Sequence, residues 1–130
     1  MSTLVAQTIS NGTVSTSSAN VIQGSAKAWA RFTGSTGAIE GSFNVSSITR
    51  NAAGDYTVNF TTAMPNANYA TVANCPYIAG VALTIAATNW SVISGTYVTP
   101  TTTAYRIAVT STSSTTGYDP NFISTAAFSS

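Results

Sequence analysis

Few side chains in this sequence could take part in acid–base chemistry. The 130 residues contain four cations, three carboxylates and no histidine. General acid–base catalysis usually needs a group whose pKa lies near the working pH, and histidine meets that need most directly. Paired carboxylates could cleave a glycosidic bond, but Asp55 and Asp119 lie in stretches, NAAGD and GYDP, where aspartate is favoured for its turn hydrogen bonds. The third carboxylate, Glu40, lies near the other end of the hairpin that the sequence predicts, so we expect no catalytic pair.

Other reactive groups are also poorly placed for catalysis. Serine and threonine are abundant, but they lack a histidine base, and Lys27 is the only lysine available for a Ser–Lys pair. Cys75 is the single cysteine, and we expect a buried, inert thiol there. One cysteine and scattered carboxylates do not make a zinc site, and no calcium-loop or glycine-rich nucleotide pattern occurs. The sequence therefore predicts no enzyme, no metal and no cofactor.

The clearest candidate for a binding site is the stretch KAWARF at residues 27 to 32. If this stretch is a strand, its side chains alternate, and Lys27, Trp29 and Arg31 share one face. That face could be a cation–π patch that docks a sugar or an acidic partner. Alternatively, Trp29 packs at a sheet face or a subunit interface, while the stems of both cations cover it and their charges reach water. The composition of the chain favours this second interpretation.

Aromatic and hydroxyl side chains could also recognise a sugar, because aromatic rings stack on sugar rings and hydroxyls supply hydrogen bonds. Most aromatic residues are better explained as core residues of alternating strands, and we expect this for four of them: Tyr56, Phe60, Trp90 and Tyr105. Positions close to predicted loops are the better candidates for exposed contacts: Tyr97, Thr101, Thr102, Tyr118 and Asp119.

The low charge of the chain limits its partners. With 5% charged residues and a formal net charge of +1, the chain has too few cations for a nucleic-acid groove. A nearly neutral surface rich in threonine does little to keep copies apart, so we expect a homo-oligomer. The longest apolar run, Ile78 to Ala87, is too short to span a membrane, and the N-terminus lacks the features of a secretory signal. We expect a mature protein that begins at this N-terminus and assembles in a reducing cytoplasm.

The chain is expected to divide into an arm and a body. Residues 1 to 25 are rich in Ser, Thr and Asn, contain an Asn11-Gly12 turn, and have too few apolar residues to fold alone. We predict that they form an extended N-terminal attachment arm that becomes ordered against other chains. Residues 26 to 130 would then form a single β domain.

Short strand patterns fill the body. The strongest is SFNVSSITRNAAGDYTVNFTT, where Phe43 and Val45 alternate, a polar turn follows, and Tyr56, Val58 and Phe60 alternate on the way back, as in a hairpin. Further strands are expected at KAWARF, Tyr69 to Asn74, Val81 to Thr88, Trp90 to Val98 with a break near Gly95, Tyr105 to Val109, and Phe122 to Phe128, with Ser111 to Pro120 as the longest polar connection. About seven or eight short antiparallel strands predict an all-β fold, a single β-sandwich or jelly-roll-like domain.

The segment KAWARFTG, followed by SFNVSSITRNAAGDYTVNFTTAMPNANYA, resembles a module of tailed-bacteriophage proteins, namely tail-fibre-like and other small virion structural proteins. In that family the corresponding sequence is close to KAWVNFNG and then SFNVSSITDNGTGDYTVNFTTAMPNANYA. The resemblance is dense from Lys27 to Ala70 and extends more loosely through AYRIAV to a final strand that ends in Ala-Phe; MSTLVAQTISNGT resembles the N-terminal lead-in of such proteins. The chain departs from the family at Ala30, Arg31 and Arg50, which makes it locally more basic.

The resemblance implies a multimeric virion structural protein without enzymatic activity, assembled in the host cytoplasm. In one interpretation the protein is a homo-oligomeric, trimeric fibre or spike component. Its arm attaches to other virion proteins, and its body contributes to host-surface recognition, with glycans as a partner. The loop tips Thr99 to Thr103 and Ser111 to Asp119 would then contact host cells. In the alternative interpretation it is a capsid decoration or cement protein whose arm and body bridge major capsid subunits.

Overall fold

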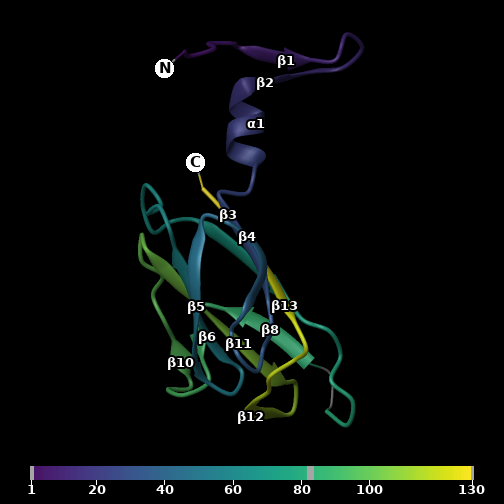
Figure 1. Ribbon diagram of the computed structural model, residues 1–130, viewed down its shortest axis with the longest axis vertical. Helices are drawn as coiled ribbons and strands as arrows, with labels where there is room; N and C mark the ends of the chain where they lie inside the picture. Colours follow the sequence, from purple (N-terminus) through teal and green to yellow (C-terminus); the bar gives the residue numbers. More distant parts are fainter. Residues whose placement is uncertain (1, 82–83, 130) are drawn as a thin grey trace.

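The computed structural model describes residues 2–81 and 84–129, and it shows a mostly β protein with one short helix. Its strands form several antiparallel sheets, and the described residues form no closed barrel. Figure 1 shows a β body and an N-terminal arm that projects from one end of it. The C-terminus lies at that same end of the body (Figure 1).

The arm forms a small hairpin and a helix, where the sequence predicts only an extended segment: β1 (Thr8–Ser10), β2 (Ser15–Ser17) and α1 (Ser18–Gly24). The hairpin turn uses the expected Asn11-Gly12 pair, in which Gly12 has a φ of 92°. Ser17 caps α1, because its Oγ accepts a hydrogen bond from the N–H of Asn20 at 3.1 Å. Seven residues make only about two helical turns, which is too short for a periodic pattern to stand out in the sequence.

One larger sheet has four strands in the order β4-β3-β13-β7, all antiparallel to their neighbours. Its strands are β3 (Ala28–Phe32), β4 (Ile39–Phe43), β7 (Ala70–Asn74) and β13 (Ile123–Phe128). In β3 the residues Ala28, Ala30 and Phe32 are buried, whereas Trp29 and Arg31 are exposed on the outer face. This alternation confirms that KAWARF contains a strand.

The other larger sheet has the order β12-β11-β6-β5, with β8 also paired to β11. Its strands are β5 (Val45–Ala52), β6 (Asp55–Phe60), β8 (Thr84–Thr88), β11 (Ala104–Ser111) and β12 (Ser114–Gly117). The separate strands β9 (Trp90–Ser91) and β10 (Thr96–Tyr97) pair with each other.

The predicted polar connection at residues 111–120 contains a strand, β12, which could not be predicted because its residues are polar. The first part of the predicted strand Val81 to Thr88 includes residues 82 and 83, which lie outside the described residues.

The core lies where buried side chains of the two larger sheets meet. The ring of Phe32 on β3 is 5.3 Å from that of Tyr56 on β6, in an edge-to-face arrangement that joins the sheets. The rings of Phe60, Tyr69 and Tyr105 make a second aromatic group. The predicted core positions Tyr56, Phe60 and Tyr105 are confirmed as buried, whereas Trp90 is only half-buried.

The predicted hairpin is confirmed in its second part and wrong at its start. Strands β5 and β6 pair on either side of a Gly-bearing turn, but Phe43 belongs to β4 in the other sheet. Asn44 separates the two strands and has a φ of 54°, which turns the chain from one sheet to the other. Because of this turn, Val45 is buried while Phe43 is 57% exposed, although strict alternation would place them on one face.

Candidate interaction surface

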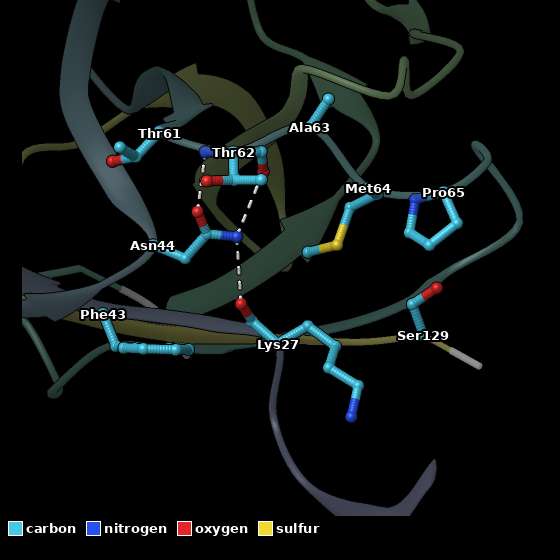
Figure 2. A pocket seen from close by; sticks show the side chains of 9 residues that line it. All are labelled: Lys27, Phe43, Asn44, Thr61, Thr62, Ala63, Met64, Pro65 and Ser129. Carbon is cyan, nitrogen blue, oxygen red and sulfur yellow. Dashed lines mark hydrogen bonds between the residues drawn. The ribbon is translucent and has the colours of Figure 1, made fainter. Parts of the chain in front are cut away.

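Asn44 is the joint that holds three segments of the body together (Figure 2). Its Nδ2 donates hydrogen bonds to the carbonyl oxygens of Lys27 and Thr62, each at 3.1 Å. Its Oδ1 accepts a hydrogen bond from the Thr62 N–H at 2.7 Å. Asparagine suits this position because it tolerates a positive φ better than most residues and offers both a donor and an acceptor. The side chain thus fixes the start of β3 against the segment that follows β6.

A cleft of about 490 Å³ opens beside Asn44, and Lys27, which directly follows the arm and its link to the body, is one of its lining residues. Its volume lies in the range of about 300–1,000 Å³ that is usual for binding sites. Figure 2 shows the residues that line it: Lys27, Phe43, Asn44, Thr61, Thr62, Ala63, Met64, Pro65 and Ser129. The apolar part comes from Phe43, Ala63, Met64 and Pro65, and the Asn44 amide is already engaged within the chain. The cleft therefore suits an apolar group better than a charged one.

An apolar row crosses the outer face of the four-stranded sheet and reaches this cleft. Trp29 pairs with Phe43 on one side and Ala126 on the other, and Ala126 pairs with Val72. We call these four residues, one from each strand, the apolar row. Trp29 is 44% exposed and Val72 is 56% exposed. Neighbouring large apolar side chains with this much exposure form a contiguous apolar patch, which is uncommon on the surface of a monomeric protein. Because Phe43 belongs to both, the row and the cleft form one continuous apolar surface.

The two cations of KAWARF are engaged away from Trp29. Lys27 Nζ donates hydrogen bonds to the carbonyl of Ile22 and to Ser25 Oγ, so it ties the end of α1 to the body. Arg31 forms an ion pair with Glu40 at 2.6 Å, and its guanidinium lies 3.7 Å from the centre of the Phe122 ring. The hydrogen bond from Arg31 lowers the pKa of Glu40. Trp29 and Arg31 are therefore exposed on one face of β3, whereas Lys27 lies just before the strand, and the Trp29 ring is partly open to solvent.

The five residues expected as exposed loop contacts do not form one site. Thr102 lies just before β11, where its carbonyl accepts a hydrogen bond from the Met64 N–H, whereas the Tyr118 N–H donates to the Val109 carbonyl near the other end of that strand. An eight-residue strand is about 25 Å long, so these loops lie at opposite ends of the body. Tyr97, Thr101 and Thr102 are exposed, and Tyr118 is half-buried.

Asp119 is not an exposed contact, because its carboxylate anchors the turn between β5 and β6. It accepts hydrogen bonds from the Arg50 guanidinium at 2.5 Å, the Tyr56 hydroxyl at 2.5 Å and the Gly54 N–H at 3.0 Å. Its side chain is only 19% exposed. Burial alone would raise the pKa of Asp119, but these hydrogen bonds outweigh it and hold the pKa below its usual range. Arg50, a departure from the resembling module, is therefore a structural partner within this chain.

Asp55 is a buried ion-pair residue, and its interpretation as a simple turn residue is wrong. It begins β6 and is fully buried. Its carboxylate accepts hydrogen bonds from Arg106 at 2.6 Å, Ser91 Oγ at 2.7 Å and the Ile93 N–H at 3.2 Å. Burial alone would raise the pKa of Asp55, but these donors hold it below its usual range. Both aspartates are thus held ionised by arginine, whereas a general acid needs a raised pKa.

Within residues 2–81 and 84–129, no three His, Cys, Asp or Glu side chains gather where they could hold a metal ion. In the same ranges, no helix has the length and apolarity needed to cross a membrane. No family model, no curated protein and no solved structure matches this chain.

The residues of this surface that the sequence analysis missed are Phe43, Met64 and Val72. The alternation of Phe43 and Val45 predicts that both belong to the hairpin. The residue between them, Asn44, is the one sequence feature that argues against this, because asparagine is favoured in turns between strands. Met64 and Val72 gave no signal of their own. Whether Val72 faces outward depends on its pairing with Ala126, which is not visible in the local sequence.

Proposed function

We propose that this protein is a structural component of a tailed-bacteriophage virion, a homo-oligomeric fibre or spike subunit that attaches through its N-terminal arm. We further infer that the body is a β-sandwich whose layers are the two larger sheets, with the aromatic groups of Phe32, Tyr56 and Tyr105 between them. The oligomer is a trimer, and the protein acts without a cofactor and without catalysis. Its partners are copies of itself and the tail or capsid proteins to which the arm attaches.

The observation that carries this proposal is the exposure of apolar side chains in the arm, which the described residues of the chain leave largely uncovered. Leu4 is 91% exposed, Val5 is 87% exposed, and no residue of α1 is buried. Fully burying a side chain of this kind is worth about 1.5–3 kcal/mol, so leaving several of them in water gives up much favourable free energy. A projecting segment of this composition gains that free energy when it lies against another chain.

The virion class comes from the resemblance of residues 27 to 70, and the structure gives physical roles to several residues of that stretch. Asn44 is the joint beside the cleft, Gly54 allows the turn that Asp119 anchors, and Asp55 holds Arg106. The module that the chain resembles has the same residue types at these three positions. A module with these internal contacts would keep the same body while the exposed loops vary, which suits a part reused among virions.

Imaging of whole virions with a count of copies per particle tests the proposal. We expect a few to dozens of copies at the tail, and a protein lacking residues 1 to 25 should fold as a body but fail to join particles. Normal incorporation of the truncated protein would assign attachment to another region. Far-ultraviolet circular dichroism of the truncated body separates a failure to attach from a failure to fold.

Capsid decoration is the second candidate function, and the breadth of the apolar surface favours it. The apolar row spans all four strands of an outer sheet face, which could lie flat on a capsid subunit. In that case hundreds of copies would lie at capsid symmetry axes, and loss of the protein would lower capsid stability without abolishing adsorption. A glycan array probed with the intact oligomer tests the host-recognition part of the first candidate, because a receptor-binding fibre should give a signal and a decoration protein should not.

A further inference from the structure

We infer that the arm of one copy lies across the apolar row and cleft of a neighbouring copy, so that the homo-oligomer is built by arm exchange. This inference rests on the homo-oligomer of the proposed function and names the two surfaces that would hold it together. Each copy carries one arm and one receiving surface. Exchange in a ring would therefore satisfy every copy and close the assembly.

Several apolar side chains of the arm line one groove. A groove of about 380 Å³ lies between its first residues and α1, and it is lined by Leu4, Val5, Ala6, Ile9, Ser18 and Ile22. Residues 1 to 25 contain no charged side chain. The arm can therefore enter an apolar site without burying an unpaired side-chain charge.

The receiving surface matches the arm in polarity. The apolar row and the cleft join through Phe43, and the nearest cations are already satisfied within the chain, since Arg31 pairs with Glu40 and Lys27 binds the end of α1. A strongly charged partner would meet Lys27 and Arg31 here, and both already have partners within the chain. A neutral, apolar segment would lose little by leaving water there.

The connection between arm and body favours exchange with another copy. Only Ser25 and Ala26 link α1 to Lys27, and two residues reach at most about 7 Å. The sheet has three strand spacings of about 4.8 Å each, so the row extends roughly 14 Å. Laying the arm across the row of its own copy would require breaking the contacts of Lys27 with Ile22 and Ser25. In Figure 1 the arm points away from the body, as an arm that reaches a neighbour would.

Site-specific photo-cross-linking of the full chain tests the inference. Phe43 is replaced by a photo-reactive phenylalanine analogue, and this protein is assembled with isotope-labelled wild-type copies. After irradiation we expect cross-linked peptides that join Phe43 of one copy to residues 2–24 of a labelled copy. The same analogue at Tyr97, which is 64% exposed and belongs to β10, is the matched control and should give no cross-link to the arm, because β10 lies toward the other end of the body (Figure 1).

Association measured by light scattering provides the second readout. We expect F43S and I22S each to weaken association at least tenfold, while Y97S leaves it unchanged and all three variants keep the β circular dichroism of the wild type. Cross-links from Phe43 to the body of another copy, to the arm of its own copy, or a wild-type protein that stays monomeric would each overturn arm exchange. An oligomer that enters virions but gives no cross-link between Phe43 and the arm would overturn exchange and leave the proposed function standing, whereas a wild-type monomer would overturn both.

Discussion

Replacing Arg106 by methionine should destabilise the protein by about 3–5 kcal/mol at neutral pH, the usual loss when one partner of a buried ion pair is removed. The Asp55 carboxylate is fully buried, and Arg106 is its ion-pair partner at 2.6 Å. The methionine keeps an apolar stem of similar length, so the loss reports the charge rather than a cavity. Ser91 and the Ile93 N–H would remain as donors, but neither brings a positive charge. Since small domains are stable by roughly 5–15 kcal/mol, this is a large fraction of the total.

The assay is urea unfolding followed by tryptophan fluorescence at fixed protein concentration, because association would add to the apparent stability. The pH dependence of the free energy of unfolding provides a second, independent test. In the wild type the folded-state pKa of Asp55 lies below its ordinary 3.8, so its contribution is present above that pH and is lost as the pH falls through the lowered pKa. Without Arg106, we expect burial of Asp55 to outweigh the remaining donors, Ser91 and the Ile93 N–H, and to raise its pKa above the ordinary range. The R106M protein should therefore lose stability as the pH rises from about 4 to 7.

The control is R31M, which breaks the exposed pair with Glu40 and should cost less than about 1 kcal/mol. If R106M also loses less than about 1 kcal/mol, or if its stability does not fall between pH 4 and 7, the buried ion pair is not what holds β6, β9 and β11 together. Either result would refute the role of Asp55 as a buried ion-pair residue.

Three further predictions concern the turn anchored by Asp119 and the apolar row. G54A should destabilise the protein by more than about 2 kcal/mol in thermal unfolding, because Gly54 has a φ of 68° and an added Cβ would lie 2.4 Å from the Val109 carbonyl. G80A, with a φ of 80° but open space around it, should cost only on the order of 1 kcal/mol, and equal losses would mean that crowding at Gly54 is unimportant. D119N should flatten the acid side of the stability curve, because the pKa of Asp119 is lowered from 3.8 and its contribution disappears as the pH falls through that lowered value; an unchanged acid slope would contradict the anchoring role. W29S should change the unfolding free energy by less than about 1 kcal/mol in the monomer yet weaken association in sedimentation, and a large loss of stability alone would instead identify Trp29 as a packing residue.

The strands were the part of the fold that local patterns could predict. The alternation of Tyr56, Val58 and Phe60 gave β6, and that of Tyr105, Ile107 and Val109 gave β11. Such patterns are local because successive side chains of a strand point to opposite faces. A strand with one buried face therefore has apolar residues at every second position. The helix α1 escaped prediction because seven uncharged residues with no buried face leave no such pattern.

The pairing of charged residues could not be predicted in the same way. Asp55 and Arg106 are 51 residues apart, and Arg50 and Asp119 are 69 apart, yet each pair is in direct contact. In a chain with only seven ionised side chains, a buried carboxylate must find one of four cations, but the strand register alone decides which one. For the same reason, the local sequence around Asp119 predicts an exposed turn, whereas the structure shows that its carboxylate binds Arg50, Gly54 and Tyr56.

The sequence by itself determined that the chain forms β-strands, that its surface is nearly uncharged, and that it offers little material for catalysis, because composition and period-two alternation are properties of neighbouring residues. Tertiary structure alone decided that Asn44 turns the chain between two sheets and that Trp29, Phe43, Val72 and Ala126 stand in one row. Those facts depend on which strands pair and in what register. Pairing is set by the free energy of the whole core, to which residues distant in the sequence contribute together.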